Sequence, residues 1–270
     1  MVVQHNMSAM NANRQLGVTT GTLSKSTEKL SSGYRINRAA DDAAGLSISE
    51  KMRSQIRGLN KASSNAQDGI SAIQTAEGAL NEAHSILQRM NELATQAAND
   101  TNTSADRTAV QSEVNALTKE LNRIASTTQF NTKNLLDGTF SGKNLQVGAL
   151  ANQSISISIG TMNAGALSVN ALCVSTFSKA GSAMTAIQKA ISKVSTQRSN
   201  LGALQNRLEH TVNNLDNVSE NTQTAESRIR DTDMASEMVQ YSATSIIQQA
   251  GQSMLAQANS QTQGVLSLLQ

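Results

Sequence analysis

The chain has 270 residues, a net charge of +2, no proline and no tryptophan, and only two tyrosines and three phenylalanines. Because compact cores usually bury aromatic side chains and proline is the strongest helix breaker, this composition argues against a thick globular core and favours long helices packed by aliphatic side chains. A single cysteine excludes an intrachain disulfide. The charges form no basic patch with stacking aromatics, which argues against nucleic-acid binding, and no run of about 18 apolar residues predicts a membrane span.

The first long element is predicted between residues 48 and 97. Apolar side chains recur there in steps of three and four, from Ile48 to Ala97, which is the pattern of one helix face. About 55 residues at 1.5 Å each would span on the order of 80 Å. Such an unbroken length is typical of a coiled coil rather than of an ordinary globular helix.

A second helix is predicted directly after the polar loop 99–103. Thr103 followed by Asp106 has the spacing of a capping box, in which each side chain satisfies a backbone N–H of the other. The stripe from Val110 to Ile124 again advances in steps of three and four. Because the loop is short, we expect this helix to fold back against the first one.

The middle of the chain changes character. Asp137–Gly138 is a turn signal, and residues 154–159 alternate serine with isoleucine, which is the period of a strand with one buried face. We therefore predict a small antiparallel β element between about residues 138 and 177.

A third long helix is predicted from near Ser182. Its apolar positions return every seven residues, which is the pattern of helices that supercoil around partners. The series comprises Ile187, Val194, Leu201, Leu208, Leu215, Thr222 and Ile229.

The two ends of the chain are amphipathic and nearly uncharged. Residues 238–270 carry no charged side chain, so we expect both ends to become ordered by packing against other chains. The predicted fold is mainly α: an elongated antiparallel coiled coil or helical-bundle rod with a small central β element and terminal helices that order on assembly. The predicted self-assembly residues are Val3, Met7, Met10, Leu16, Ile246, Ile247, Met254, Leu255, Val265, Leu266 and Leu269.

Short motifs along almost the whole chain resemble those of bacterial flagellins, the subunits of the flagellar filament. No single motif is specific for this family, but the occurrence of all of them in this order, at both ends of one chain, is specific. They are Gln4-His-Asn6, Lys29-Leu-Ser-Ser-Gly33, Arg35-Ile-Asn-Arg38, Asp41-Asp-Ala-Ala-Gly-Leu46, Asp68-Gly-Ile-Ser71, Gln74-Thr-Ala-Glu-Gly78, Leu201-Gly-Ala-Leu-Gln-Asn-Arg207, Glu226-Ser-Arg-Ile-Arg230, Ala256-Gln-Ala-Asn259 and Val265-Leu-Ser-Leu-Leu269.

This resemblance implies a domain organisation. Residues 1–43 and 232–270 would form the two parts of an inner core domain, and residues 44–231 would form the helical rod that carries the β element. Only about 40 residues separate the second and third helices, so the variable outer domains of the family are expected to be absent.

The resemblance also implies function and partners. The expected function is self-polymerisation into the extracellular flagellar filament for motility, without cofactors. Residues 1–10 lack the charged and apolar regions of an ordinary signal peptide, and the family is exported unfolded. The implied partners are further copies of the chain, a flagellar export chaperone and the export apparatus, hook-junction and filament-cap proteins, and Toll-like receptor 5, the vertebrate innate receptor for flagellin.

One segment resembles the part of flagellins that this receptor recognises. It extends from Gln88 to Gln96 in the first long helix. The alternative interpretation is that these residues serve filament packing, with Leu93 in or beside the helix seam. The predicted receptor-binding residues are Gln88, Arg89, Glu92, Leu93, Gln96 and Glu113.

Other functions remain as alternatives or are rejected. A hook–filament junction protein shares related ends, and a secreted amphipathic membrane-binding protein would need Lys or Arg on the polar face of its helices. An enzyme is not expected, because His5, His84 and His210 show no metal-binding spacing and no phosphate-binding loop occurs. Cys173 is interpreted as a small buried hydrophobic residue.

Overall fold

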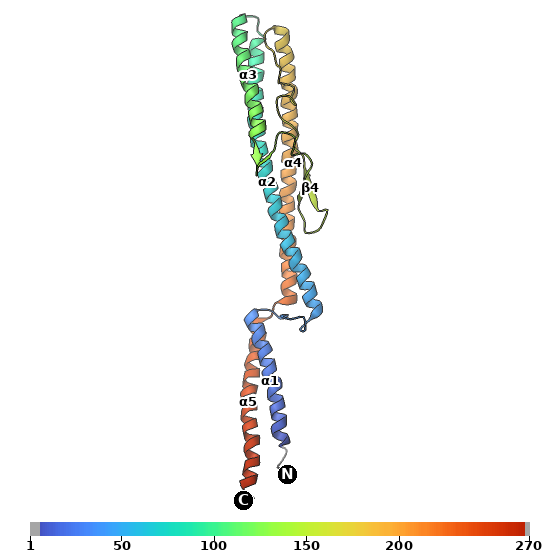
Figure 1. The fold of residues 1–270 in the computed structure, drawn as a ribbon, viewed down its shortest axis with the longest axis vertical. Coiled ribbons are helices and arrows are strands. Elements are labelled where there is room, and N and C mark those ends of the chain that lie inside the picture. The colour runs from blue at the N-terminus through green and yellow to red at the C-terminus, as the bar shows by residue number, and fades with distance from the viewer. Residues whose placement is uncertain (1–5, 268–270) are drawn as a thin grey trace. The chain divides into compact units, whose positions relative to one another are not determined.

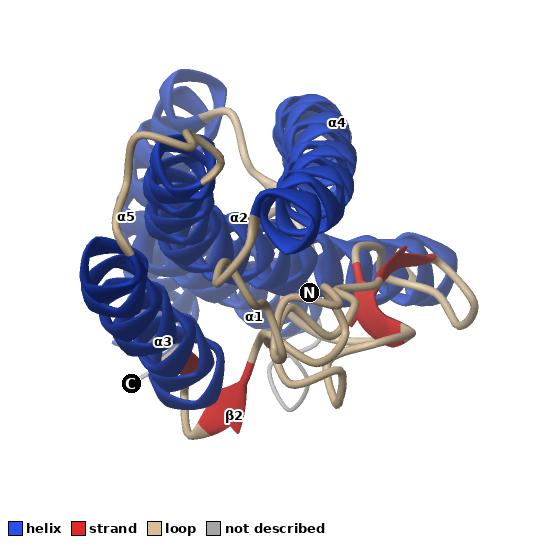
Figure 2. Ribbon diagram, turned by 90° about the horizontal axis from the view of Figure 1, so that it is seen from above, coloured by secondary structure: helices blue, strands red, loops and turns tan. Residues whose placement is uncertain are grey.

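The computed structural model describes the backbone of residues 6–267 and the side chains of residues 6–261. The chain forms two compact units, one from residues 1–54 and 221–270 and the other from residues 55–220. In the described part, five helices account for most of the structure, and the two sheets are small (Figures 1 and 2). The mainly α prediction with a small β element is confirmed.

The unit of residues 55–220 is built on three helices. It contains most of α2 (Ala43–Ala97), all of α3 (Ser104–Thr127) and most of α4 (Phe177–Arg230), and Figure 1 shows α3 and α4 both running opposite to α2. The burial of their largest aliphatic side chains shows that the predicted seams of the three helices face one another. The side chains that are wholly inaccessible to solvent include Ile73, Leu80, Leu87, Leu121, Ile187, Val194, Leu201 and Leu208.

The capping box predicted at the start of α3 is present. The backbone N–H and the hydroxyl of Thr103 both donate to Asp106 Oδ2, at 2.9 and 2.7 Å, and the backbone N–H of Asp106 donates to the Thr103 hydroxyl. Because these donors favour the charged carboxylate, they lower the pKa of Asp106.

Two short antiparallel sheets lie between α3 and α4. β3 (Lys143–Gln146) pairs with β4 (Ser154–Ile157), within the region predicted as β, and β4 buries alternate residues. β1 (Gln129–Phe130) pairs with β2 (Lys133–Asn134) before that region begins. The sequence did not predict this pair, because two-residue strands are too short to show alternation.

Glycines on α2 make room for the β3–β4 hairpin. A Cβ atom at Gly69 would collide with the Leu145 side chain, and one at Gly58 would lie 2.8 Å from the Cβ of Ala149. Backbone of α2 and the hairpin therefore approach more closely than larger side chains would allow. The hairpin is held against the helix at both its strand and its tip.

The unit of residues 1–54 and 221–270 is built around α1 (Met7–Ser32) and α5 (Met234–Ser267), which lie side by side in opposite directions (Figure 1). Gly33 ends α1 with φ 77°, a left-handed conformation that favours glycine. Tyr34 then forms an antiparallel bridge with Asp231 and stacks under the guanidinium of Arg230, 4.7 Å from its ring centre. The connection that follows α1 is thus joined to the connection that precedes α5.

The lowered pKa of Asp106 makes the capping box sensitive to acid. Because the folded-state pKa lies below the unfolded value of about 3.8, the stabilisation is present above that pH and is lost as pH falls through the folded pKa. We expect the melting temperature of the wild-type chain to exceed that of Asp106→Ala at pH 7, and the difference to vanish near pH 2. Circular dichroism melts at several pH values measure it. A difference that stays constant with pH would contradict the role of the charged carboxylate.

Candidate functional site

The contact between α1 and α5 is regular in spacing but poor in apolar side chains. The least exposed positions of both helices advance in alternating steps of three and four, as in a coiled coil. We call these positions the terminal seam. On α1 they are Ala9, Ala12, Leu16, Thr19, Leu23, Ser26 and Leu30, and on α5 they are Glu237, Tyr241, Thr244, Gln248, Gly251, Leu255 and Ala258.

Most described self-assembly residues point away from this seam. Leu16 and Leu255 are half-buried within it. The others are exposed, with exposed fractions between 57% and 66%: Met7, Met10, Ile246, Ile247 and Met254. Val3 and Leu269, and the side chains of Val265 and Leu266, lie outside the described residues.

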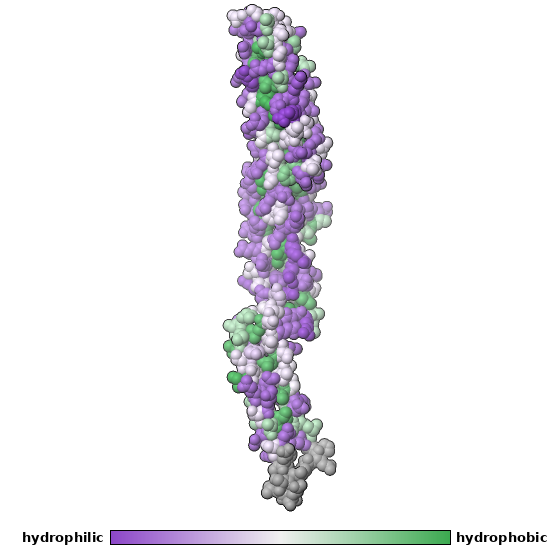
Figure 3. Space-filling view, turned by 60° about the vertical axis from the view of Figure 1, so that its left-hand side comes forward, coloured by the Kyte–Doolittle hydropathy of each residue, from purple (hydrophilic) through white to green (hydrophobic). Residues whose placement is uncertain are grey.

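Four further apolar residues of the terminal helices, with exposed fractions between 47% and 70%, were not predicted. They are Val18, Met234, Met238 and Val239. The sequence alone did not reveal them, because their position off the terminal seam can be recognised only after the structure has shown which residues form the seam. In Figure 3 the surface formed by α1 and α5 is green and nearly white over much of its area, whereas the surface of residues 55–220 is mostly purple.

The terminal helices carry apolar surface that the described residues of their own unit do not cover. Among the described residues of this unit, Ile36 is the only hydrophobic side chain that is buried, and it lies in the connection after α1 rather than in either terminal helix. Contiguous exposed apolar surface is typical of protein interaction sites. The apolar faces of the terminal pair are therefore a candidate interaction surface.

The second candidate surface lies on α2 and α3. The Arg89 guanidinium donates to Glu113 on α3 at 3.0 and 3.1 Å and to Glu92 one turn along α2 at 3.1 Å. These carboxylates raise the pKa of Arg89, Glu113 contributing most. Gln88 and Gln96 are exposed beside this ion-pair group.

Leu93 differs from the other predicted receptor-binding residues. Its exposed fraction is 1%, and it packs in the core with Met90, Ala94 and Ala97. This position agrees with the alternative interpretation, in which Leu93 belongs to the helix seam. A partner could touch its side chain only if the helices separated.

Cys173 is less buried than the sequence interpretation expected. Its Sγ lies 3.2 Å from the hydroxyl of Ser175, and this hydrogen bond lowers the pKa of the thiol. Within the described residues, no group of three or more His, Cys, Asp or Glu side chains is placed to hold a metal ion. No described helix combines the length and hydrophobicity that crossing a membrane requires.

Comparison with known proteins identifies the family. The bacterial flagellin N-terminal helical region matches residues 3–141, and the bacterial flagellin C-terminal helical region matches residues 184–269. The chain belongs to the bacterial flagellin family. The flagellin of Halalkalibacterium halodurans is 55% identical over 271 residues, which cover 100% of both chains. This flagellin shares the short form, without room for large outer domains.

Other flagellins match over less of their length, and the chain covers 43–46% of two of the curated relatives. Among solved structures, a flagellin of Bacillus cereus is 31% identical, with a TM-score of 0.50 over 56% of this chain and 88% of that one. A putative flagellar hook-associated protein of Vibrio parahaemolyticus gives a TM-score of 0.60 over 71% of this chain and all of that one. At 13% identity, this likeness shows a shared fold alone.

Family membership establishes the general role of the chain. It is a structural subunit of the extracellular flagellar filament rather than an enzyme, and flagellins self-assemble.

Leu93 and Arg89 are predicted to differ in how much their substitution lowers stability. Leu93→Ala should lower the free energy of unfolding by about 2–5 kcal/mol, because it leaves a cavity in the core. Arg89→Ala should lower it by less than about 1 kcal/mol, because exposed ion pairs contribute little. Chemical denaturation of the two variants measures both. Equal losses would contradict the assignment of Leu93 to the core and Arg89 to the surface.

Proposed function

We propose that this flagellin polymerises through the exposed apolar faces of α1 and α5, and that these faces define the inner contacts between subunits. The observation that carries the proposal is that both helices direct large apolar side chains to solvent while their mutual seam holds mainly small or polar ones. Association would remove those side chains from water, at roughly 25 cal/mol for each Å² of apolar surface buried. Contacts of this kind that repeat without closing generate a helical filament.

The near absence of charge supports the same role. From residue 238 onward the chain has no charged side chain, so many copies can approach one another without electrostatic repulsion. We propose that residues 1–43 and 232–270 act as the inner core domain, and that residues 44–231 act as the rod. Ordering of the terminal helices on assembly would couple their folding to growth.

Removal of the C-terminal contact should abolish polymerisation. Deletion of residues 238–270 should leave a helical monomer that does not extend seeds, because the α5 face is lost. The sharper variant is Ile246→Ser with Ile247→Ser, which should raise the critical concentration for growth by at least about tenfold through lost apolar burial. Gln249→Ser, on the same helix, is the control and should polymerise normally. Negative-stain microscopy of seeded growth gives the answer, and normal filaments from the double variant would contradict the proposal.

The exposed faces also suggest why a chaperone is needed before assembly. We propose that a flagellar export chaperone covers the apolar face of α5 and that the chain passes through the export apparatus unfolded. The absence of proline and disulfides suits this route, because it removes slow isomerisation and covalent loops. Hook-junction and filament-cap proteins are proposed to contact the same terminal helices at the two ends of the filament.

Recognition by Toll-like receptor 5 is proposed for the second surface. Arg89, held between Glu113 and Glu92, presents a planar donor group that is 52% exposed at its side chain. Arginine at the centre of an interface is often a residue on which binding depends strongly. Gln88 and Gln96 supply adjacent polar contacts. Leu93 supports this surface from beneath.

Arg89→Ala should weaken binding to the receptor ectodomain by about tenfold or more, because the principal donor group is lost. Arg123→Ala is a matched control, since Arg123 is also exposed and ion-paired, with Glu120 on α3. Surface plasmon resonance measures the affinities, and circular dichroism confirms that helicity is unchanged. Equal affinity of the Arg89 variant and the wild-type chain would reject the contact.

A further inference from the structure

The terminal seam leaves the alignment of α1 and α5 underdetermined by apolar packing. Because the seam positions repeat with the spacing of heptads, sliding one helix by seven residues, about 10 Å, would bring seam positions face to face again. Most of these positions are small or polar, so little apolar area distinguishes one alignment from another. Other contacts must select the register.

Three neutral contacts mark the observed register without enforcing it. Asn6 Nδ2 donates to the carbonyl of Ala258 at 2.8 Å, and Gln248 Nε2 donates to the hydroxyl of Thr20 at 3.3 Å. Leu16 lies against Gly251, where an added Cβ would be 3.5 Å from its Cδ1. Both helices are rich in Ser, Thr, Asn, Gln and Ala, so a shifted alignment could replace contacts of these kinds.

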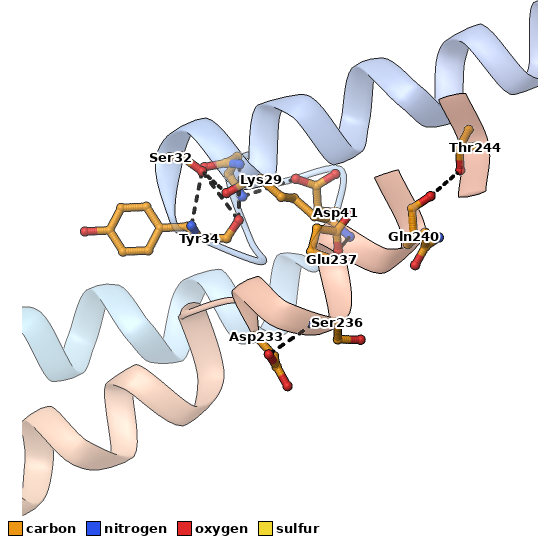
Figure 4. A network of polar contacts seen from close by, with 10 residues as sticks. Lys29, Ser32, Tyr34, Asp41, Asp233, Ser236, Glu237, Gln240 and Thr244 are labelled. Atoms are coloured by element: carbon orange, nitrogen blue, oxygen red, sulfur yellow. Dashed lines mark hydrogen bonds and ion pairs between the residues drawn. The ribbon is translucent and has the colours of Figure 1, made fainter. Parts of the chain in front are cut away.

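The contact between Lys29 and Glu237 is different. Lys29 Nζ lies 3.4 Å from Glu237 Oε2, and the Glu237 side chain is only 9% exposed (Figure 4). Its other oxygen, Oε1, is buried and makes no hydrogen bond. The carboxylate therefore depends on Lys29 and on the start of α5, whose first turn favours a negative charge.

A shift by one heptad in either direction removes the cation that lies opposite Glu237 in the observed register. The only other cations of α1 are Arg14 and Lys25, fifteen and four residues before Lys29. A seven-residue shift in one direction places Thr22 at the level of Lys29, and in the other direction α1 has already ended. The shifted alignment would take from the largely buried Glu237 carboxylate the cation that it has in the observed register, which is unfavourable.

We propose that the Lys29–Glu237 ion pair sets the register of α1 against α5, so that both apolar faces are presented to neighbouring subunits in one fixed alignment. The pair acts by excluding wrong alignments, as a polar residue in a coiled-coil seam does. Its consequence for the filament rests on the assembly role proposed above.

The register can be read by cross-linking within single chains in the filament. In a Cys173→Ser background, Thr20→Cys is combined with Gln248→Cys to report the observed register. Thr20→Cys is instead combined with Tyr241→Cys or with Leu255→Cys to report a shift of one heptad in either direction. Each chain is copolymerised sparsely on seeds with the cysteine-free chain, so that a short bismaleimide joins cysteines of one molecule. The variants are Glu237→Gln and the charge swap Lys29→Glu with Glu237→Lys. Glu28→Gln is the control, because Glu28 pairs with Arg38 on the exposed side.

With Glu237 intact, the 20–248 product should dominate. Glu237→Gln should raise a shifted product relative to it by about tenfold or more, and the charge swap should restore the original ratio. Glu28→Gln should change nothing. An unchanged ratio in Glu237→Gln, or a charge swap that fails to restore it, would overturn the proposal.

If the Glu237→Gln chain is poorly incorporated into filaments, the charge-swap chain tests the register role. Recovered incorporation with the 20–248 product supports the register role, and failure to recover overturns it. Failure of both the wild-type chain and the Cys173→Ser chain to extend seeds would instead contradict the proposed assembly function, so the two failures are distinguishable.

Discussion

Burial of aliphatic side chains between α2, α3 and α4 is the interaction on which the unit of residues 55–220 depends. Leu80, Leu87 and Leu208, from two different helices, are wholly buried in one continuous core. The terminal pair has the same helical spacing but a different chemistry, because its seam is occupied mainly by small and polar residues. One unit therefore buries most of its large apolar side chains internally, whereas the terminal helices of the other leave several of theirs exposed.

This division explains how one chain can be both a stable subunit and a polymerising one. A terminal pair that buried its large apolar side chains in a core of its own would have less apolar surface to bury on association. In the proposed assembly, apolar side chains that face outward, such as Ile246 and Met254, become buried when neighbouring subunits pack against them. The cost is an adhesive surface on the free subunit, which accounts for the proposed need of a chaperone during export.

A seam of small and polar residues also needs a means of selecting one alignment. Buried ion pairs are a weak source of net stability, because desolvation of both charges offsets their attraction. They are effective at excluding arrangements that would separate the charges. Lys29 and Glu237 fit this second role, since the surrounding seam offers the carboxylate no alternative cation.

The sequence by itself determined the features that a helix encodes locally. The periodic positions of α2, α3 and α4, the capping box at Thr103 and the alternation in β4 all depend on residues within a few positions of one another. The short pairing of β1 with β2 left no such periodic signal.

Only the tertiary structure decided which side of each helix meets another helix. It placed Leu93 in the core although Arg89, one turn earlier, is exposed. It also brought Lys29 to Glu237 across 208 residues of chain. The physical reason is that periodicity defines a face, whereas the partner of that face is set by packing between segments that are distant in the sequence.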